Sequence, residues 1–424
     1  MKIQDIKAIQ IIDSRGNPTV EVKIQSSQNY AIGSCPSGAS TGSLEALELR
    51  DGFANLFQGK SVTKAVNHVN TVIKNAVVGE SFDSIEQFDE LLKNLDNTEN
   101  KSRLGANAIL SCSIAFTKLL AKENKVEIFE LFSKNPSLPV AMMNVLNGGV
   151  HADNPLNIQE FMIMPVYGNS FAESLRCGCE IYQTLKKILH DKKLSTNVGD
   201  EGGFAPYLSS HIDALDLICE SIQKSGYEVG KDVLLTLDVA ATELYSNGKY
   251  EINPNKFLNK QEMLNFYADL IKKYPIFSIE DAFSENDDEA FIKMSEFIGN
   301  KLQIVGDDVF VTNPKILQDK MQKNICNTVL IKPNQIGTIS ETIQFTELAK
   351  SNNYNTVMSH RSGETEETII SDLAVGLNTM QIKTGAPARG ERVAKYNRLL
   401  RVESEYPDIK FSGSDIFEKF KKLR

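Results

Sequence analysis

Six charged residues stand directly after short apolar runs in the second half of the chain. The runs VLLTL, PIFSI and LQIVG are followed by carboxylates, whereas TVLI, NTVMSH and MQI are followed by cations. In chain order, the six residues are Asp238, Glu280, Asp307, Lys332, Arg361 and Lys383. A charge beside a buried run loses hydration, so it needs an opposite charge or an ion. These residues are therefore expected to form either internal ion pairs or a binding site.

The order of charge types indicates a chemistry. Three carboxylates that converge without histidine or cysteine make an oxygen-only site, which suits Mg²⁺ or Mn²⁺ better than zinc or copper. The lysines and the arginine opposite such a metal would hold an anionic substrate, and the forked guanidinium of Arg361 suits phosphate or carboxylate.

Three further segments carry candidate residues. Glu201 lies in the glycine-rich segment GDEGGFAP, and Glu160 enters the apolar run that starts at Phe161. The pKa of Glu160 would be raised by burial or by a nearby Glu201, although both could be ordinary strand-end acids or turn residues. Ser40 lies in the hydroxyl-rich loop PSGASTG, which is either an ordinary loop or a lid. This loop lacks Gly-Lys-Ser/Thr, so a nucleotide site is not expected.

The elements that position these residues are predicted from their spacing. Successive charged ends lie roughly 23 to 42 residues apart, close to the length of a strand, loop and helix. Such repeats indicate a parallel barrel or a doubly wound sheet. A barrel gathers its strand ends around one mouth, so the six charged ends favour the barrel.

The first part of the chain has a different pattern. IKAIQIIDS and PTVEVKI flank a turn cluster and predict a hairpin, and residues 104–122 predict a helix that is buried on most sides. We expect an α+β unit up to about residue 133 and a linker at 135–139.

Composition excludes some classes of protein. The chain has 424 residues, with 46 Lys+Arg against 55 Asp+Glu, and a net charge of −9. This balance argues against nucleic acid or an anionic membrane as the main partner. No apolar run approaches the roughly 18 to 20 residues of a membrane span, and no signal peptide is recognised. The six cysteines show no zinc spacing, so reduced thiols in a cytoplasmic protein are expected.

Long motifs give the sequence a resemblance to the enolase family. They are DSRGNPTVEV (13–22), PSGASTG (36–42), EALELRDG (45–52), NGGVHADN (147–154), QEFMIMP (159–165), VGDEGGFAP (198–206), SIED (278–281), VGDD (305–308), VTNP (311–314), IKPNQIGT (331–338), SHRSGETE (359–366) and QIKTGAPARGERVAKYN (381–397). The resemblance implies an α/β fold: an N-terminal α+β domain (1–134) with a mobile lid loop, and a catalytic domain (135–424) that is a modified eight-stranded, TIM-like α/β barrel. It also implies reversible dehydration of 2-phosphoglycerate to phosphoenolpyruvate, with two Mg²⁺ ions in each active site.

The resemblance also implies a role for each site residue. Asp238, Glu280 and Asp307 would bind the first Mg²⁺, and Ser40 would help to place the second. Lys332 would remove the C2 proton, Glu201 would protonate the leaving C3 hydroxyl, and Glu160 would support Glu201. The substrate would be bound by Gln159, His151, Lys332, Arg361, Ser362 and Lys383. We expect metal charge to lower the pKa of Lys332 and the surroundings of Glu201 to raise its pKa.

Other expectations concern partners and location. The family suggests a homo-oligomer, either a dimer or an octamer of dimers. Some enolases capture plasminogen at the cell surface through lysines, and the tail SDIFEKFKKLR is a candidate for this, with a packed C-terminal helix as the alternative. A surface or secreted pool without a signal peptide would then accompany the cytoplasmic one. Another lyase or an epimerase of the superfamily would keep the carboxylate triad but has little reason to keep PSGASTG and SHRSGETE.

Overall fold

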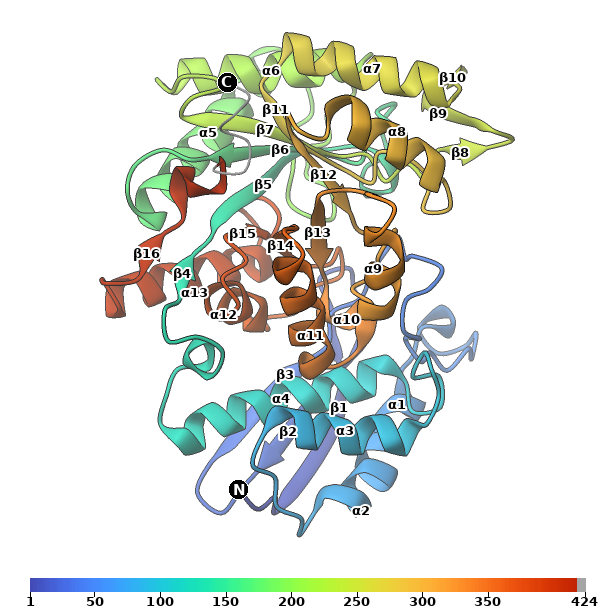
Figure 1. Cartoon of the computed structure of the whole chain (residues 1–424), viewed down its shortest axis with the longest axis vertical. Coiled ribbons are helices and arrows are strands. Elements are labelled where there is room, and N and C mark those ends of the chain that lie inside the picture. The colour runs from blue at the N-terminus through green and yellow to red at the C-terminus, as the bar shows by residue number, and fades with distance from the viewer. Residues whose placement is uncertain (418–424) are drawn as a thin grey trace.

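An antiparallel sheet begins the chain in the computed structural model, which describes residues 1–417 (Figure 1). Its strands are β1 (Asp5–Ile12), β2 (Pro18–Gln25) and β3 (Tyr30–Ser34), in that order. Strands β1 and β2 pair from Asp5 with Gln25 to Ile12 with Pro18, which confirms the predicted hairpin. Alternate side chains such as Ile6 point into the core.

Helices cover one face of this sheet. They are α1 (Thr63–His68), a π-helical stretch (Val69–Ile73), α2 (Lys74–Val77), α3 (Ile85–Asp96) and α4 (Ala106–Asn124). Helix α4 is buried along most of its length, as predicted, and packs against β2 and β3. The Phe88 ring of α3 stacks on Phe116 of α4 with centroids 4.2 Å apart. Gly33 lets β3 approach α4, since a Cβ atom there would lie 2.5 Å from the Ala115 backbone nitrogen.

The rest of the described chain is built around a closed eight-stranded barrel, which confirms the predicted α/β fold. Its strands are β5 (Val140–Asn147), β6 (Glu160–Pro165), β7 (Val233–Asp238), β11 (Ile276–Glu280), β12 (Gln303–Gly306), β13 (Thr328–Ile331), β14 (Asn355–Ser359) and β15 (Gln381–Lys383). Each of the six predicted charged ends is the last residue of a strand or lies within two residues of its end. The strands are short and almost entirely buried, as expected for strands covered on both faces, although they also carry buried polar side chains such as Asn144, Thr236 and Gln303.

One strand breaks the parallel pattern. Strand β6 runs antiparallel to both β5 and β7, while the other neighbouring barrel strands are parallel. Its first residue, Glu160, therefore pairs with Asn147 at the end of β5 and Asp238 at the end of β7. This reversal brings the start of β6 to the same mouth as the ends of the other strands.

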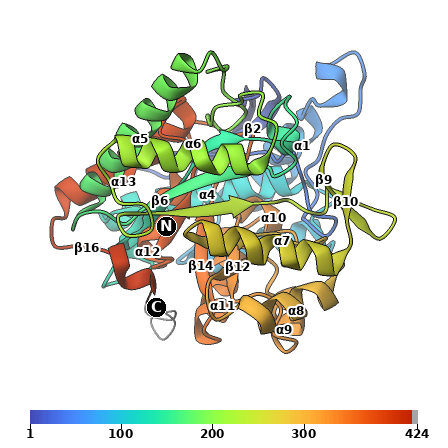
Figure 2. The same cartoon turned by 90° about the horizontal axis from the view of Figure 1, so that it is seen from above.

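Helices surround the barrel on its outside (Figures 1 and 2). They are α5 (Phe171–Asp191), α6 (His211–Lys224), α7 (Lys260–Lys273), α8 (Asp288–Ile298), α9 (Pro314–Met321), α10 (Pro333–Ile336), α11 (Ile339–Ser351), α12 (Ile369–Gly376) and α13 (Gly390–Glu405). Amphipathic α5 begins at Ser170, whose hydroxyl accepts the Glu173 N–H as an N-cap. Helices α6, α7 and α11 begin in the same way at Ser210, Asn259 and Thr338.

Two small sheets complete the fold. Strands β8 (Tyr245–Ser246), β9 (Lys249–Asn253) and β10 (Lys256–Leu258) form a separate meander. Strand β4 (Ser137–Leu138) pairs with β16 (Lys410–Phe411), so the segment expected as a linker contains a short paired strand. The lysines proposed for plasminogen, Lys421 and Lys422, lie outside the described residues.

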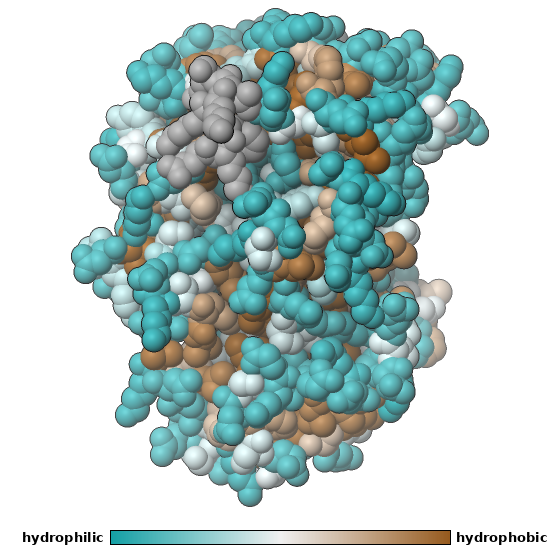
Figure 3. Space-filling model, in the orientation of Figure 1, coloured by the Kyte–Doolittle hydropathy of each residue, from teal (hydrophilic) through white to brown (hydrophobic). Residues whose placement is uncertain are grey.

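The face of the molecule shown in Figure 3 is largely hydrophilic, with scattered apolar areas. None of the helices within residues 1–417 is long and apolar enough to cross a membrane. All six cysteines are free thiols, as expected.

Candidate active site

One narrow pocket at the barrel mouth collects the residues singled out by the sequence. Its lining consists of Ser40, His151, Gln159, Glu160, Glu201, Asp238, Ala240, Asp281, Asp307, Asp308, Lys332, Ser359, His360, Arg361, Ser362 and Lys383. Glu280 does not line the pocket but is fully buried beneath it, beside Lys383. The structure thus brings every sequence-predicted site residue to one place.

Lys383 is the counter-ion of the predicted metal ligands. Its ammonium group lies 2.7 Å from Asp238 Oδ2, 3.0 Å from both Glu280 oxygens and 3.2 Å from Glu160 Oε1. Burial alone would lower the pKa of Lys383, but the surrounding carboxylates raise it well above its ordinary value. The protein's own cation therefore balances this part of the acidic cluster.

Lys332 holds the third predicted ligand. Its Nζ donates to Asp307 Oδ2, and Gln335 Nε2 donates to Asp307 Oδ1 at 2.9 Å. Burial would lower the pKa of Lys332, yet the charge of Asp307 outweighs it and raises the pKa. The lowering that we expect from metal charge stays a prediction, because the raised pKa describes Lys332 with the Asp307 carboxylate as its nearest charge.

Arg361 joins residues 40–45, which follow and partly include the predicted lid loop, to the barrel. Its guanidinium donates to Glu45 Oε2 at 3.0 Å, to Asn334 Oδ1 at 3.1 Å and to the Ser40 carbonyl at 3.0 Å. Next to it, the Ser362 hydroxyl accepts the Ala39 N–H at 2.7 Å. The Arg361 guanidinium, which is expected to bind an anion, is therefore already hydrogen-bonded to Glu45 and to the Ser40 carbonyl.

The same segment also contacts two glutamates that follow barrel strands. The Ser40 hydroxyl donates to Glu243 at 2.9 Å, and the Ser43 N–H donates to Glu285 at 3.2 Å. The mobility that we expect of this segment stays a prediction, and the structure shows it in contact with the barrel.

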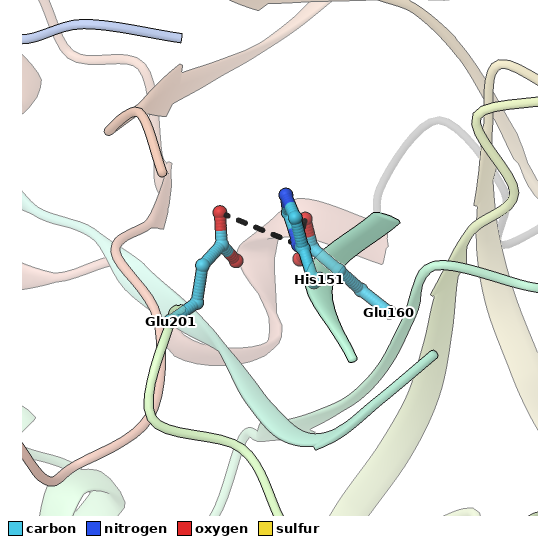
Figure 4. A group of neighbouring side chains, drawn as sticks. All are labelled: His151, Glu160 and Glu201. Carbon is cyan, nitrogen blue, oxygen red and sulfur yellow. Dashed lines mark ion pairs between the residues drawn. The ribbon is translucent and has the colours of Figure 1, made fainter. Parts of the chain in front are cut away.

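A second acidic cluster lies beside the first and contains His151, Glu160 and Glu201 (Figure 4). His151 Nδ1 lies 3.9 Å from one oxygen of each glutamate. Burial and the charge of Glu201 raise the pKa of Glu160 well above its ordinary value, as expected. Burial would also raise the pKa of Glu201, but His360, His151 and a nearby arginine lower it overall. The expected rise at Glu201 is therefore wrong in this structure, whereas the expected rise at Glu160 is confirmed.

The acidic residues at the mouth fit a hard divalent cation by their chemistry. Asp238, Glu280 and Asp307 offer only carboxylate oxygens from three adjacent strands. The Gln159 Oε1 and Glu160 Oε2 atoms are buried without a hydrogen-bond partner among the described residues. Asp307 also belongs to a tight cluster with Asp281 and Asp308. The Asp281 carboxylate accepts the backbone N–H groups of Asp307 and Asp308, one on each oxygen, and so stabilises the loop that carries these two residues.

Sequence reasoning missed several groups in the pocket. Asp281, Asp308 and His360 line it directly, and Glu45 reaches it through Arg361. All four lie inside motifs that carried the family resemblance, so the signal was present in the sequence. Six of the predicted residues were chosen for their place at a strand end and the others for a role that the resemblance implies, and neither criterion selected these four.

Fold and pocket together define an α/β-barrel enzyme with an acidic, cation-lined mouth covered by an N-terminal domain. Comparison with family models agrees with this class. The model described as enolase, C-terminal TIM barrel domain, matches residues 135–420, and the model described as enolase, N-terminal domain, matches residues 3–132. The chain belongs to the enolase family, a family of lyase type whose members generally bind Mg²⁺.

Proposed function

We propose that this protein catalyses the reversible, Mg²⁺-dependent dehydration of 2-phosphoglycerate to phosphoenolpyruvate. The observation that carries the proposal is the single pocket in which buried carboxylates alternate with Lys332, Lys383 and Arg361. Such a site can hold a doubly anionic substrate and also bind the cations that its reaction requires.

Three residues of the chain carry out the proton transfers of the proposed reaction. Lys332 removes the proton from C2, and Glu201 gives a proton to the hydroxyl that leaves C3. Glu160, whose pKa is raised by burial and by the charge of Glu201, supports Glu201 by sharing a proton with it. In the reverse direction, Glu201 accepts the proton from water.

Substrate recognition uses the cations at the mouth. Arg361 and Ser362 bind the phosphate once Glu45 and the lid release them. Lys383 lies at the carboxylate end, where negative charge increases when the C2 proton leaves, and Gln159 and His151 complete the contacts. Asp238, Glu280 and Asp307 would hold the first Mg²⁺ and Ser40 would help to place the second. When bound, Mg²⁺ supplies further positive charge to the substrate carboxylate.

Solvent exchange at C2 tests the division of roles. The Lys332→Ala variant is expected to lose exchange of the substrate C2 proton with deuterated solvent, whereas Glu201→Gln is expected to keep exchange but lose dehydration. Both are followed by proton NMR of the substrate. Loss of exchange in both variants would show that the assignment of the first step is wrong.

The alternative reaction class is separated by its products. Another lyase or an epimerase would act on other carboxylates, so incubation with chiral carboxylates and measurement of racemisation discriminates it. A homo-oligomer, cytoplasmic location and surface capture of plasminogen remain predictions from the family resemblance. Deleting residues 421–424 is expected to abolish plasminogen binding and spare turnover, and unchanged binding would refute that mechanism.

A further inference from the structure

Asn144 on β5 is a fully buried asparagine that lies behind the proposed acid, Glu201. Its side-chain Nδ2 donates to Glu201 Oε2 at 3.1 Å. Its Oδ1 atom is buried and has no hydrogen-bond partner among residues 1–417. The contact with Glu201 is therefore the one side-chain hydrogen bond of Asn144 within the described chain, and it decides how the amide is oriented.

A bulge in β5 directs Asn144 towards the loop that carries Glu201. The pairing of β5 with β6 shifts by one residue between Asn144 and Leu146, so Val145 is the extra residue. The Val145 carbonyl accepts the Phe204 N–H at 2.9 Å, at the end of the glycine-rich loop. Bulges commonly re-aim a side chain beside an active site. The same irregularity of the strand thus holds the loop and presents Asn144 to its glutamate.

The two carboxylate oxygens of Glu201 face different sides. Oε1 lies 3.9 Å from His151 Nδ1, in the cluster of Figure 4. Glu201 and His151 both line the pocket, whereas Asn144, which contacts Oε2, does not. Oε1 is therefore the oxygen on the side of the pocket, and Oε2 is the oxygen on the side of the protein interior.

The direction of this hydrogen bond determines which oxygen of Glu201 carries a proton. The Asn144 Nδ2 group can only donate, so Oε2 must accept. When Glu201 is protonated, the accepting oxygen is the carbonyl oxygen, and the proton lies on Oε1. With the amide turned over, Oδ1 would face the carboxylate and would draw the proton to Oε2, away from the pocket. The donor at Oε2 thus keeps the proton where a substrate can receive it.

We propose that Asn144 is a positioning residue that places the transferable proton of Glu201 on Oε1. This inference rests on the proposed function, since it assigns Glu201 a proton-transfer step. In that step the proton leaves Oε1 for the hydroxyl oxygen on C3, the C3–O bond breaks and water departs. The carboxylate that remains keeps its hydrogen bond at Oε2. No contact joins Asn144 to Lys332 within residues 1–417, so removal of the C2 proton does not depend on Asn144.

Two substitutions at position 144 test the donor. Asn144→Leu is similar in size but has no donor, so the proton can reside on either oxygen. We expect its kcat for dehydration to fall about 10- to 100-fold, with little change in KM. Asn144→Asp replaces the donor by an acceptor and should lower kcat further. Both variants should keep exchange of the substrate C2 proton. Dehydration at the wild-type rate in Asn144→Leu, or an equal loss of exchange and dehydration, would contradict the proposal.

Asn147→Leu is the matched control for general packing. Asn147 lies on the same strand and is equally buried, and neither atom of its amide has a hydrogen-bond partner among the residues described. Any loss that this variant causes should affect C2 exchange and dehydration alike, so the ratio of the two rates should stay at the wild-type value. The same change of ratio in both leucine variants would show a packing effect and overturn the positioning role.

Neutron diffraction of the deuterated wild-type protein tests the proposal without any variant. The expected density shows two deuterons on Asn144 Nδ2, one of them directed at Glu201 Oε2, and no deuteron on Oε2. An Asn144 Oδ1 atom that faces Oε2, or a deuteron on Oε2, would overturn the proposal even if none of the variants folds.

The wild-type protein also separates this inference from the proposed function. If wild type forms phosphoenolpyruvate but Asn144→Leu keeps the wild-type ratio of dehydration to C2 exchange, only the positioning role fails. If wild type shows neither C2 exchange nor phosphoenolpyruvate, the proposed function itself fails.

Discussion

At the scale of the residue, the site is a balance of buried opposite charges. Lys383 is surrounded by Asp238, Glu280 and Glu160, and Lys332 is held by Asp307. Each charge would be costly to bury alone, so the group is stable only as a set. The set must also be able to rearrange, because substrate and metal take over some of these contacts. The structure therefore describes the site in its self-paired form.

Replacing Lys383 tests this balance. Lys383→Met leaves Asp238 and Glu280 without their buried counter-ion, so the free energy of unfolding should fall by about 3 to 5 kcal/mol in chelator. Added Mg²⁺ should recover part of the loss, because it supplies the missing positive charge. Urea unfolding with and without Mg²⁺ measures both effects. The matched control is Lys272→Met, at an exposed lysine whose partner Asp269 is also exposed, and it should change little.

At the scale of the element, short strands deliver the charged residues to one mouth. The sequence was sufficient to predict these strands, because apolar runs ending in a charge mark strands buried on both faces. It did not reveal the reversed direction of β6, since an apolar run reads the same in either direction. It also did not predict that Arg392 of helix α13 is fully buried. An arginine in a helix is expected to face solvent, and its burial depends on how the helix packs on the barrel.

The close packing of β3 on α4 gives a prediction at this scale. Gly33→Ala would place a Cβ atom 2.5 Å from the Ala115 backbone nitrogen and 2.7 Å from the Ser111 carbonyl oxygen. Because backbone atoms cannot turn aside, the strand and helix must separate, at a cost of about 1 to 3 kcal/mol in unfolding free energy. Denaturant unfolding checks this.

Gly390→Ala serves as the matched control, since a Cβ atom there meets no heavy atom within 4 Å. It lies at the first position of α13, where alanine is a better helix former, so stability should be unchanged or slightly higher. If both substitutions were equally harmless, the packing between β3 and α4 would be looser than described.

At the scale of the whole molecule, the N-terminal part is held against the barrel by many specific contacts, and three of them involve helix α11. Asp89 on α3 accepts the Ser340 N–H of α11 at 2.8 Å, and the Ser113 hydroxyl of α4 accepts the Ile339 N–H at 3.0 Å. Lys101 pairs with Glu341 at 2.9 Å. These contacts hold helices α3 and α4 against helix α11 of the barrel. The net charge of −9 does not exclude an anionic substrate, because Lys332, Arg361 and Lys383 are gathered in one pocket.

Asp89 should make the stability of this contact depend on pH. Burial raises its pKa from 3.8 to about 6, so the folded chain holds a proton that the unfolded chain loses. Folding takes up a proton between these two values, and stability therefore falls as pH rises through that window. Asp89→Asn should be more stable than wild type by about 1 to 3 kcal/mol at pH 7.5 and similar to it near pH 4. Urea unfolding at both pH values tests this, and a lower stability of Asp89→Asn at pH 7.5 would contradict it.

The most direct measurement is the ultraviolet absorbance of phosphoenolpyruvate during incubation of the full-length protein with 2-phosphoglycerate. The account predicts a rise in absorbance with Mg²⁺, its loss with a chelator and its return when Mg²⁺ is added in excess. Lys332→Ala, folded to the same extent, should show no rise. Absence of turnover in the folded wild-type protein with excess Mg²⁺ would contradict the central claim.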